Sequence, residues 1–139
     1  MLDDLPRLHA RMLACLDELD QLTRQAAPPM DRLPAVRLDL TRASRARTML
    51  LDRRHLDLLN RASAAERAQI EELKAAAKQD LIVSANHIGA WTLREIAARW
   101  PDYCAASNDL RRAMRDRIAR EKKLIYPLLD RGGKGAEAA

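Results

Sequence analysis

The sequence predicts a single all-α domain folded as an antiparallel, up-down-up-down four-helix bundle. The composition favours helix over sheet, because the 139 residues include only 4 Gly and no Phe and are rich in Ala, Leu and Arg. Apolar residues recur every three or four positions over long stretches, which is the period of an amphipathic helix. Prolines and a capping motif divide the chain into four such stretches with short connections, which is the layout of a bundle.

The first two helices are expected at residues 3–25 and 34–61. In the first, apolar side chains and His9 follow a 3-4-3-4-3 spacing, which places His9 on the inward face. A Pro-Pro pair ends this helix, since proline cannot continue the hydrogen-bond ladder, and Pro34 suits the first turn of the second helix. Arginines interrupt the apolar stripe of the second helix, so some of them must lie near its buried face.

The third helix is expected at residues 63–100. Ser63 and Glu66 form a capping-box pattern at its start, and the Trp-Pro pair at its end stops it. Between these points the pattern allows an unbroken helix or one that bends, and we favour a bend near residues 79–84.

The fourth helix, expected at residues 102–129, carries the most informative feature of the chain. Its apolar stripe consists of Leu110, Met114, Ile118, Ile125 and Leu128. Glu121 lies on this stripe, and Arg117 lies one turn before it. A carboxylate that faces a core is costly unless it is paired or bound to a metal. Glu121 is therefore expected to be either a metal ligand or half of an ion pair.

Length and composition indicate one soluble domain at residues 1–130, followed by a polar, Gly-rich tail at 131–139 that is expected to be flexible. The two cysteines have no metal-binding spacing. The N-terminal segment lacks a secretory h-region, and no run of about 18 apolar residues occurs. We therefore expect a cytoplasmic protein without a membrane span.

The segment 121–129, Glu-Lys-Lys-Leu-Ile-Tyr-Pro-Leu-Leu, resembles the fourth helix of the hemerythrin-like (HHE cation-binding) family. There the usual pattern is a histidine, three residues, one or two glutamates and an apolar-aromatic-Pro-Leu close. Residues 47–59 also align faintly with 117–129, either through duplication of a helix pair or by chance between two Arg- and Leu-rich helices. The resemblance implies a four-helix bundle over nearly the whole chain, with iron at its centre.

Carried over residue by residue, the resemblance is incomplete at the metal. His9 and His87 take the places of the first- and third-helix histidines, and Glu121 takes that of the fourth-helix carboxylate. Arg117 stands where the fourth helix should supply a histidine, and Arg47 stands at a ligand position of the second helix. With 3 His in the chain, a full di-iron, oxygen-carrying site is excluded within one chain.

The hypothesis that we prefer from the sequence is a non-catalytic bundle with a degenerate metal centre and no cofactor. Arg47 and Arg117 would fill the former metal cavity by pairing with Glu121 and Asp52. Such pairs add little net stability over apolar packing but cost several kcal/mol when one half is removed. The surface would then act by binding a protein partner or a small ligand, and a homodimer is left open.

Two alternatives are kept. His9, His87 and Glu121 could bind one iron or zinc ion through two imidazoles and one carboxylate. A basic stripe on the second and fourth helices could bind nucleic acid, since the net charge is +5. Against the nucleic-acid alternative, acidic residues interrupt the stripe, no helix-turn-helix is evident and aromatic residues make up 3% of the chain. Enzymatic activity is not expected, because the sequence lacks a P-loop, a GxGxxG motif and a nucleophile elbow.

Overall fold

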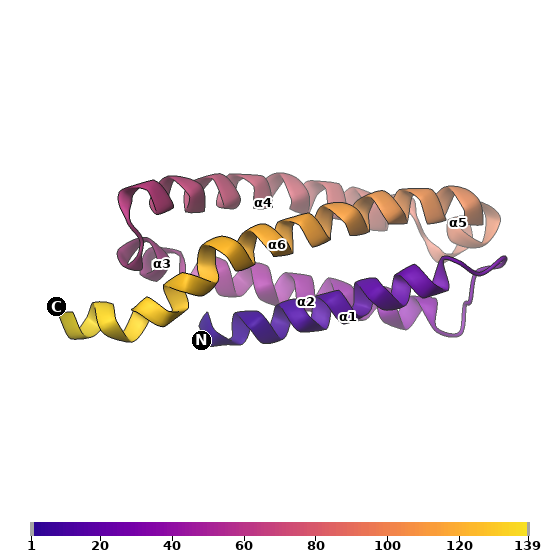
Figure 1. Cartoon of the computed structure of the whole chain (residues 1–139). Helices are drawn as coiled ribbons and strands as arrows, with labels where there is room; N and C mark the ends of the chain where they lie inside the picture. Colours follow the sequence, from indigo (N-terminus) through magenta and orange to yellow (C-terminus); the bar gives the residue numbers. More distant parts are fainter. Residues whose placement is uncertain (1, 139) are drawn as a thin grey trace.

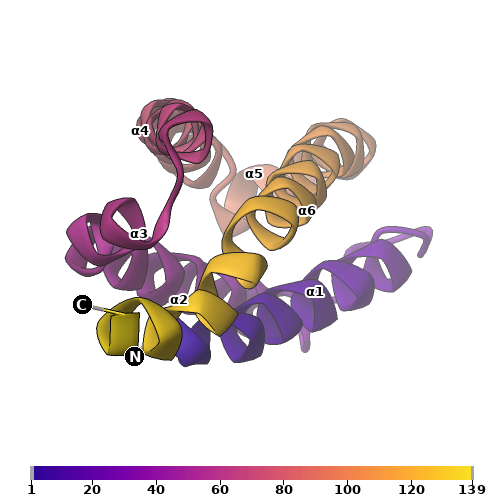
Figure 2. The same cartoon turned by 60° about the vertical axis from the view of Figure 1, so that its left-hand side comes forward.

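The computed structural model describes the backbone of residues 2–138 and the side chains of residue 2 and residues 4–131. Within these residues the chain is helical and contains no strand, which confirms the predicted all-α class. The long helices are α1 (Leu5–Leu22), α2 (Leu33–Arg53), α4 (Ala64–Ala90) and α6 (Trp100–Ala138). The short ones are the 3-10 helix η1 (Leu2–Asp4), α3 (His55–Arg61) and α5 (Leu93–Ala98). The long helices lie alongside one another (Figure 1), with α4 and α6 over the α1–α2 pair (Figure 2).

Helices α1 and α2 begin and end close to the positions that the prolines predict. Pro6 and Pro34 each lie in the first helical turn, where a missing backbone N–H costs nothing. At the end of α1, the carbonyl of Leu19 accepts both the backbone N–H and the hydroxyl of Thr23, at 2.9 Å and 2.8 Å, which caps the last turn. The two helices pack against each other more closely than any other pair among the described residues.

The second predicted helix is in fact two helices, so the expected continuous span over residues 34–61 is wrong. The chain departs from α-helical geometry at Arg54, with φ −103° and ψ 12°, and α3 begins at the next residue. The break brings Leu58 into the core, where it is 2% exposed and packs in a cluster with Ile70 and Leu128. No proline or glycine marks this position, so tertiary burial decided it.

The third predicted helix begins as expected and breaks later than expected. Ser63 and Glu66 form the predicted capping box, with both reciprocal hydrogen bonds present. Helix α4 then runs without a break through residues 79–84, so the expected bend there is wrong. The chain breaks instead at Trp91, whose buried side chain joins the core and whose carbonyl accepts a hydrogen bond from Arg37 at 2.7 Å. Thr92 then caps α5.

Helix α6 begins at Trp100, one residue before the proline that was expected to separate the last two helices. It continues through Pro127 and past the predicted end at residue 129 to Ala138. The predicted tail begins at residue 131, and its side chains from 132 onward lie outside the described residues. None of the described helices combines the length and the apolar composition needed to cross a membrane.

The apolar core has two clusters, one toward each end of the molecule. The larger one joins the later half of α1, the first half of α2 and the start of α6, around Met12, Val36 and Tyr103. The smaller one joins the opposite ends of these helices to α3 and the start of α4, around Leu5 and Leu58. The side chains between the two clusters on α1, α2 and α6 are polar, and they form the candidate site.

Helix α4 is the least packed of the long helices. Along its 27 residues only Ile70 is buried, although α1 buries seven residues and α2 buries six. Its main neighbours are α6 and α3. It therefore covers one side of the core but leaves most of its own surface exposed.

Candidate functional site

One polar side chain from each of three helices forms a buried layer between the two apolar clusters. His9 of α1 is 0% exposed, Arg47 of α2 is 4% exposed and Glu121 of α6 is 1% exposed. Each replaces an apolar residue in a three-and-four-residue repeat that continues on both sides. The repeats are Leu5–His9–Met12, Ala43–Arg47–Leu50 and Ile118–Glu121–Ile125. The same periodicity that builds the core therefore brings these polar groups together.

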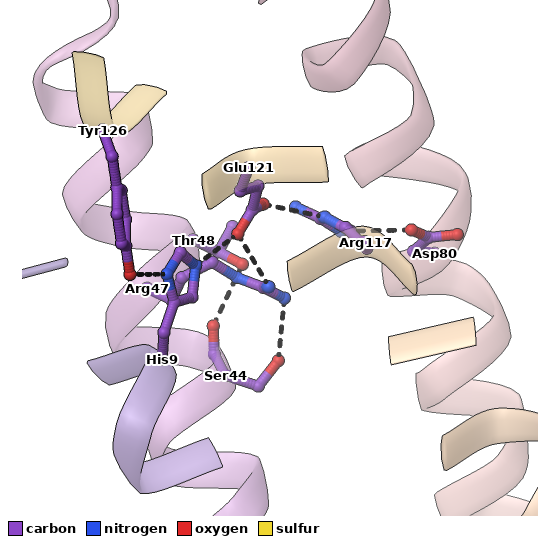
Figure 3. Close-up of polar contacts among 8 residues, drawn as sticks. All are labelled: His9, Ser44, Arg47, Thr48, Asp80, Arg117, Glu121 and Tyr126. Atoms are coloured by element: carbon purple, nitrogen blue, oxygen red, sulfur yellow. Dashed lines mark hydrogen bonds and ion pairs between the residues drawn. The ribbon is translucent and has the colours of Figure 1, made fainter. Parts of the chain in front are cut away.

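Glu121 is at the centre of this layer (Figure 3). Its Oε1 lies 2.7 Å from His9 Nε2 and 3.2 Å from Arg47 Nη1, and its Oε2 lies 3.0 Å from Arg117 Nε. Burial by itself would raise the pKa of Glu121. The hydrogen bond from His9 and the charges of Arg47 and Arg117 together outweigh burial and hold that pKa below its ordinary value. The carboxylate is therefore ionised and has a donor at each oxygen.

His9 is held at both ring nitrogens. Nε2 faces the Glu121 carboxylate, and Nδ1 lies 2.7 Å from the hydroxyl of Tyr126. Because an ionised carboxylate can only accept, Nε2 must carry a proton; in the neutral ring Nδ1 then accepts from the phenol. Burial, followed by the nearby Glu121 charge, raises the pKa of Tyr126, so the phenol keeps its proton and acts as the donor.

The two arginines extend the layer from Glu121 toward the surface. Arg117 Nη1 lies 3.3 Å from Asp80 Oδ2 of α4, and Asp80 is partly exposed. Arg47 Nη2 donates to the Ser44 hydroxyl at 3.4 Å, and its Nε has no hydrogen-bond partner among the described residues. Asp80, Arg117, Glu121 and Arg47 thus form a chain of alternating charges that sums to zero, which is the condition for burying charge at tolerable cost.

Burial has the largest effect on the pKa of Arg47 and lowers it. The Glu121 carboxylate opposes this effect, and the second cation, Arg117, reinforces it. A guanidinium stays protonated despite such shifts. Arg47 and Arg117 consequently share the single buried carboxylate of Glu121. Losing either contact would leave a buried cation without its anion, which is energetically costly.

The predicted ion pairs are present in part. Arg47 and Arg117 both form ion pairs, as the preferred hypothesis states, and both of them pair with Glu121. The second carboxylate is Asp80 rather than Asp52, since Asp80 of α4 faces Arg117. The contact of Tyr126 with His9 was not predicted from the sequence. Tyr126 lies on the same stretch of α6 as Glu121, but a partner for His9, 117 residues away in sequence, has no local signal.

His87 lies elsewhere. Its ring packs against Tyr103, with centroids 5.9 Å apart, and Tyr103 also contacts Trp91 and Trp100. Along α6, residue 103 precedes Glu121 by about 27 Å, at about 1.5 Å per residue. Burial and then the charges of Arg37 and Arg111 lower the pKa of His87 to about 4. The structure therefore brings His9 and Glu121 together but places His87 in an aromatic cluster at the other end of α6.

The third histidine is also separate. His55 Nε2 lies 2.8 Å from Glu71 Oε1 near the surface. Across the described residues, no group of three or more His, Cys, Asp or Glu side chains is placed to hold a metal ion. Within the buried layer, the potential metal ligands are the His9 imidazole and the Glu121 carboxylate. The guanidinium groups of Arg47 and Arg117 both contact that carboxylate.

Two small cavities adjoin the layer, between α2 and the α4–α6 pair. Their volumes are about 40 Å³ and about 60 Å³, and Arg117 lines both of them. Spaces of this size hold one or a few ordered waters, whereas pockets for organic ligands typically exceed about 300 Å³. The layer can accommodate water beside the guanidinium groups but not an organic substrate.

Comparison of the chain with protein-family models, with curated proteins and with solved structures finds no match. Fold and site together define an all-α protein whose core contains a neutralised, hydrogen-bonded ionic layer.

Proposed function

We propose that this chain is an antiparallel four-helix bundle of hemerythrin-like type in which ion pairs replace the metal centre. It acts without catalysis, by binding a protein partner or a small ligand. The alternating directions of α1, α2, α4 and α6 in Figure 1 support the topology. In this topology α3 belongs to the connection between the second and third helices of the bundle. Helix α5 is the short segment that follows the break at the end of the third. The cytoplasm is the proposed location, in keeping with the free thiols of Cys15 and Cys104.

The observation that carries the proposal is the pairing of both Glu121 oxygens. A divalent cation bound to Glu121 and His9 would have to displace the His9 proton and lie beside Arg47 and Arg117. Two fixed cations at this distance in a low-dielectric interior oppose a third. The residues of this layer do not fit a centre with two imidazoles and one carboxylate, because the second imidazole is absent from it.

The ionic layer also fits a non-catalytic role. A general acid, base or nucleophile needs access to a substrate, and its pKa must suit proton transfer near neutral pH. Glu121 and His9 are at most 1% exposed and are hydrogen-bonded to each other. The layer therefore fixes the register of three helices, and the binding function falls to the surface.

The nucleic-acid alternative loses support from how the arginines of α6 are used. Arg111 and Arg115 both pair with Asp20 of α1, at 2.8 Å and 2.6 Å, and Arg115 also pairs with Asp17. Arg111 is 5% exposed. These two cations hold α1 against α6, so they are not available as a phosphate-binding stripe.

Metal content tests the proposal directly. Protein purified without chelator or affinity tag is incubated with Fe(II) or Zn(II), desalted and subjected to elemental analysis beside the His87→Ala variant. The expected result is well below one equivalent per chain for both proteins and both metals. One equivalent that is lost in His87→Ala would overturn the proposal and establish the alternative site of His9, His87 and Glu121.

A further inference from the structure

A third cavity lies between the start of α1 and the end of α2, which are side by side in Figure 1. Its volume is about 390 Å³, whereas the two cavities beside the ionic layer measure about 40 Å³ and about 60 Å³. Pockets for small organic ligands typically begin at about 300 Å³. This cavity therefore has room for an organic molecule, and none of the three central residues of the ionic layer lines it.

Four aliphatic side chains form the apolar part of the lining. Helical spacing places Ala46, Met49 and Leu50 on one side of α2, and Leu8 lines the cavity from α1. Leu50 is 7% exposed and belongs to the smaller core cluster, so it forms a fixed floor, whereas Met49 is 56% exposed. The lining has no aromatic side chain on which a nucleic-acid base could stack. The apolar part suits an aliphatic group.

The charged part of the lining consists of three guanidinium groups and one carboxylate, which gives a net charge of +2. These residues are Asp4, Arg7, Arg53 and Arg54. Arg7 Nη2 donates to Asp4 Oδ1 at 2.8 Å. Arg53 is exposed and forms no ion pair with the described residues, and its Nε donates to the carbonyl of Met49 at 3.4 Å. The terminal amino groups of Arg53 thus remain available to bind a phosphate or carboxylate through two parallel hydrogen bonds.

We propose that this cavity binds a small aliphatic phosphate monoester. Its alkyl group packs on Leu8, Ala46 and Leu50, and its phosphate pairs with Arg53 at the rim. A phosphate monoester carries a charge of about −1.5 to −2 at pH 7, so it neutralises the +2 of the lining, whereas a carboxylate neutralises half of it. This inference rests on the small-ligand part of the proposed function but does not involve the ionic layer, so either can fail alone.

The features of the cavity favour a free small molecule over a lipid headgroup in a bilayer. A helix that lies on a bilayer inserts a wide apolar face. Met49 is the one large hydrophobic side chain of this lining that is exposed, and the others are buried or half-buried. The alkyl group of a ligand can therefore leave water by entering the cavity, but this surface has little apolar area to insert into a membrane.

Titration of the ¹⁵N-labelled complete chain with hexyl phosphate, followed by NMR chemical shifts, tests the proposal. We expect a dissociation constant on the order of 1 mM, from the size of the probe, and the largest shifts at the backbone amides of Leu8, Ala46 and Leu50. Inorganic phosphate and 1-hexanol represent the two halves of the probe, and each should bind at least tenfold more weakly. No saturable shift up to about 10 mM, equal binding of either half, or largest shifts outside the cavity would overturn the proposal.

Two variants that remove the same charge separate the cavity from the general basic surface. Arg53→Gln should weaken hexyl phosphate binding at least tenfold, because it removes a charged hydrogen-bond donor from the site. Arg42→Gln is the matched control, because Arg42 is an exposed residue of the same helix that does not line the cavity. This control should bind within about twofold of wild type, since salt screens a distant charge. Equal weakening in the two variants would show attraction by net charge alone and reject the site.

Filling the cavity gives a second readout that keeps every charge. Ala46→Phe places a ring in the cavity and should abolish binding of hexyl phosphate. Ala35→Phe, at an exposed position of α2 that does not line the cavity, should bind as wild type does. The dispersion of the NMR spectrum shows that each variant is folded. Undiminished binding by folded Ala46→Phe would place the ligand elsewhere and overturn the proposal.

Sedimentation with vesicles distinguishes a free ligand from a lipid headgroup. The chain is mixed with phosphatidylcholine vesicles that contain phosphatidic acid, whose headgroup is also a phosphate monoester. We expect the chain to remain in the supernatant. Vesicle binding that Arg53→Gln abolishes would assign the site to a membrane lipid and overturn the proposal of a free small molecule.

Discussion

His9 Nε2 and Glu121 Oε1 lie 2.7 Å apart in the core, although 112 residues separate them in sequence. Neither side chain is more than 1% exposed. Arg47 reaches the same carboxylate oxygen from α2, so α1, α2 and α6 meet at one atom. A hydrogen-bonded ionic group of this kind tolerates no shift in the relative register of the three helices, whereas apolar layers slide more readily. The following predictions test this arrangement and the chemistry around it.

Replacing Glu121 with Gln should destabilise the protein by about 3–5 kcal/mol, because it leaves two buried guanidinium groups without their anion. The free energy of unfolding from urea titration at pH 7 measures the effect. The control is Glu18→Gln, which breaks the more exposed pair with Arg32 and should cost about 1 kcal/mol or less. Equal losses in the two variants would show that the buried network does not constrain the fold.

The same variant has an expected pH dependence. Because the folded state lowers the pKa of Glu121 below 4.5, the stability that its charge contributes is fully present above about pH 4.5. That stability is lost as the pH falls through the lower folded-state pKa. The difference between wild type and Glu121→Gln should therefore be constant from pH 7 to pH 5 and shrink in stronger acid. If this difference in stability grows as the pH falls, folding raises the pKa of Glu121 instead of lowering it, and the prediction is wrong.

Removing the whole ionic group should be tolerated far better than removing half of it. The triple variant Arg47→Met, Arg117→Met, Glu121→Leu has no buried charge left to desolvate, and buried ion pairs are often neutral or stabilising to replace by apolar groups of similar volume. We expect its free energy of unfolding to exceed that of Glu121→Gln by at least about 2 kcal/mol. If the triple variant is the less stable of the two, the ionic layer itself is a major source of stability.

The free energy of unfolding should decrease as the pH falls from about 6.5 to about 4, because the half-buried His87 ring resists protonation. The folded state lowers its pKa from 6.5 to about 4, so over this interval the unfolded chain gains a proton that the folded chain excludes. After a discount for the solvent that screens this half-buried ring, the shift corresponds to a loss of roughly 2–3 kcal/mol, which levels off below about pH 4. Urea titrations of wild type and His87→Gln between pH 7 and pH 4 measure it. Parallel curves for the two proteins would place His87 in solvent rather than against Tyr103.

Restoring imidazoles should restore metal binding if the layer is a degenerate metal centre. The double variant Arg47→His, Arg117→His removes both cations and places up to three imidazoles beside the Glu121 carboxylate, a donor set suited to Zn(II) or Co(II). We expect about one equivalent of Co(II) per chain, with the visible absorption of a four-coordinate site. Arg42→His, Arg112→His, at exposed positions on the same two helices, is the control and should bind none. If the Arg47→His, Arg117→His variant binds neither ion, the layer is not a degenerate metal centre.

The sequence was sufficient to identify the groups at the centre of the layer. Glu121 and Arg117 are recognisable because a carboxylate interrupts an apolar repeat with a cation one turn away, and both facts are local. His9 is recognisable by the same periodicity on the first helix. Asp80 and Tyr126 could not be assigned, because their partners lie on other helices. His87 has a similar sequence pattern to His9 but lies in the aromatic cluster, since nothing local records where along α6 the third helix packs.

By itself the sequence determined the all-α class, the capping box at Ser63 and the candidate pair of Arg117 with Glu121 one turn away, because helical period, capping and i,i+4 charge pairing act over a few residues. Only the tertiary structure decided that the chain breaks at Arg54 and Trp91, that α4 is unbroken from Ala64 to Ala90 and that Arg47 of α2 reaches the Glu121 carboxylate. These features depend on which side chains find space in a core assembled from distant segments. Burying Leu58 and Trp91 there outweighs the backbone hydrogen bonds lost at each break.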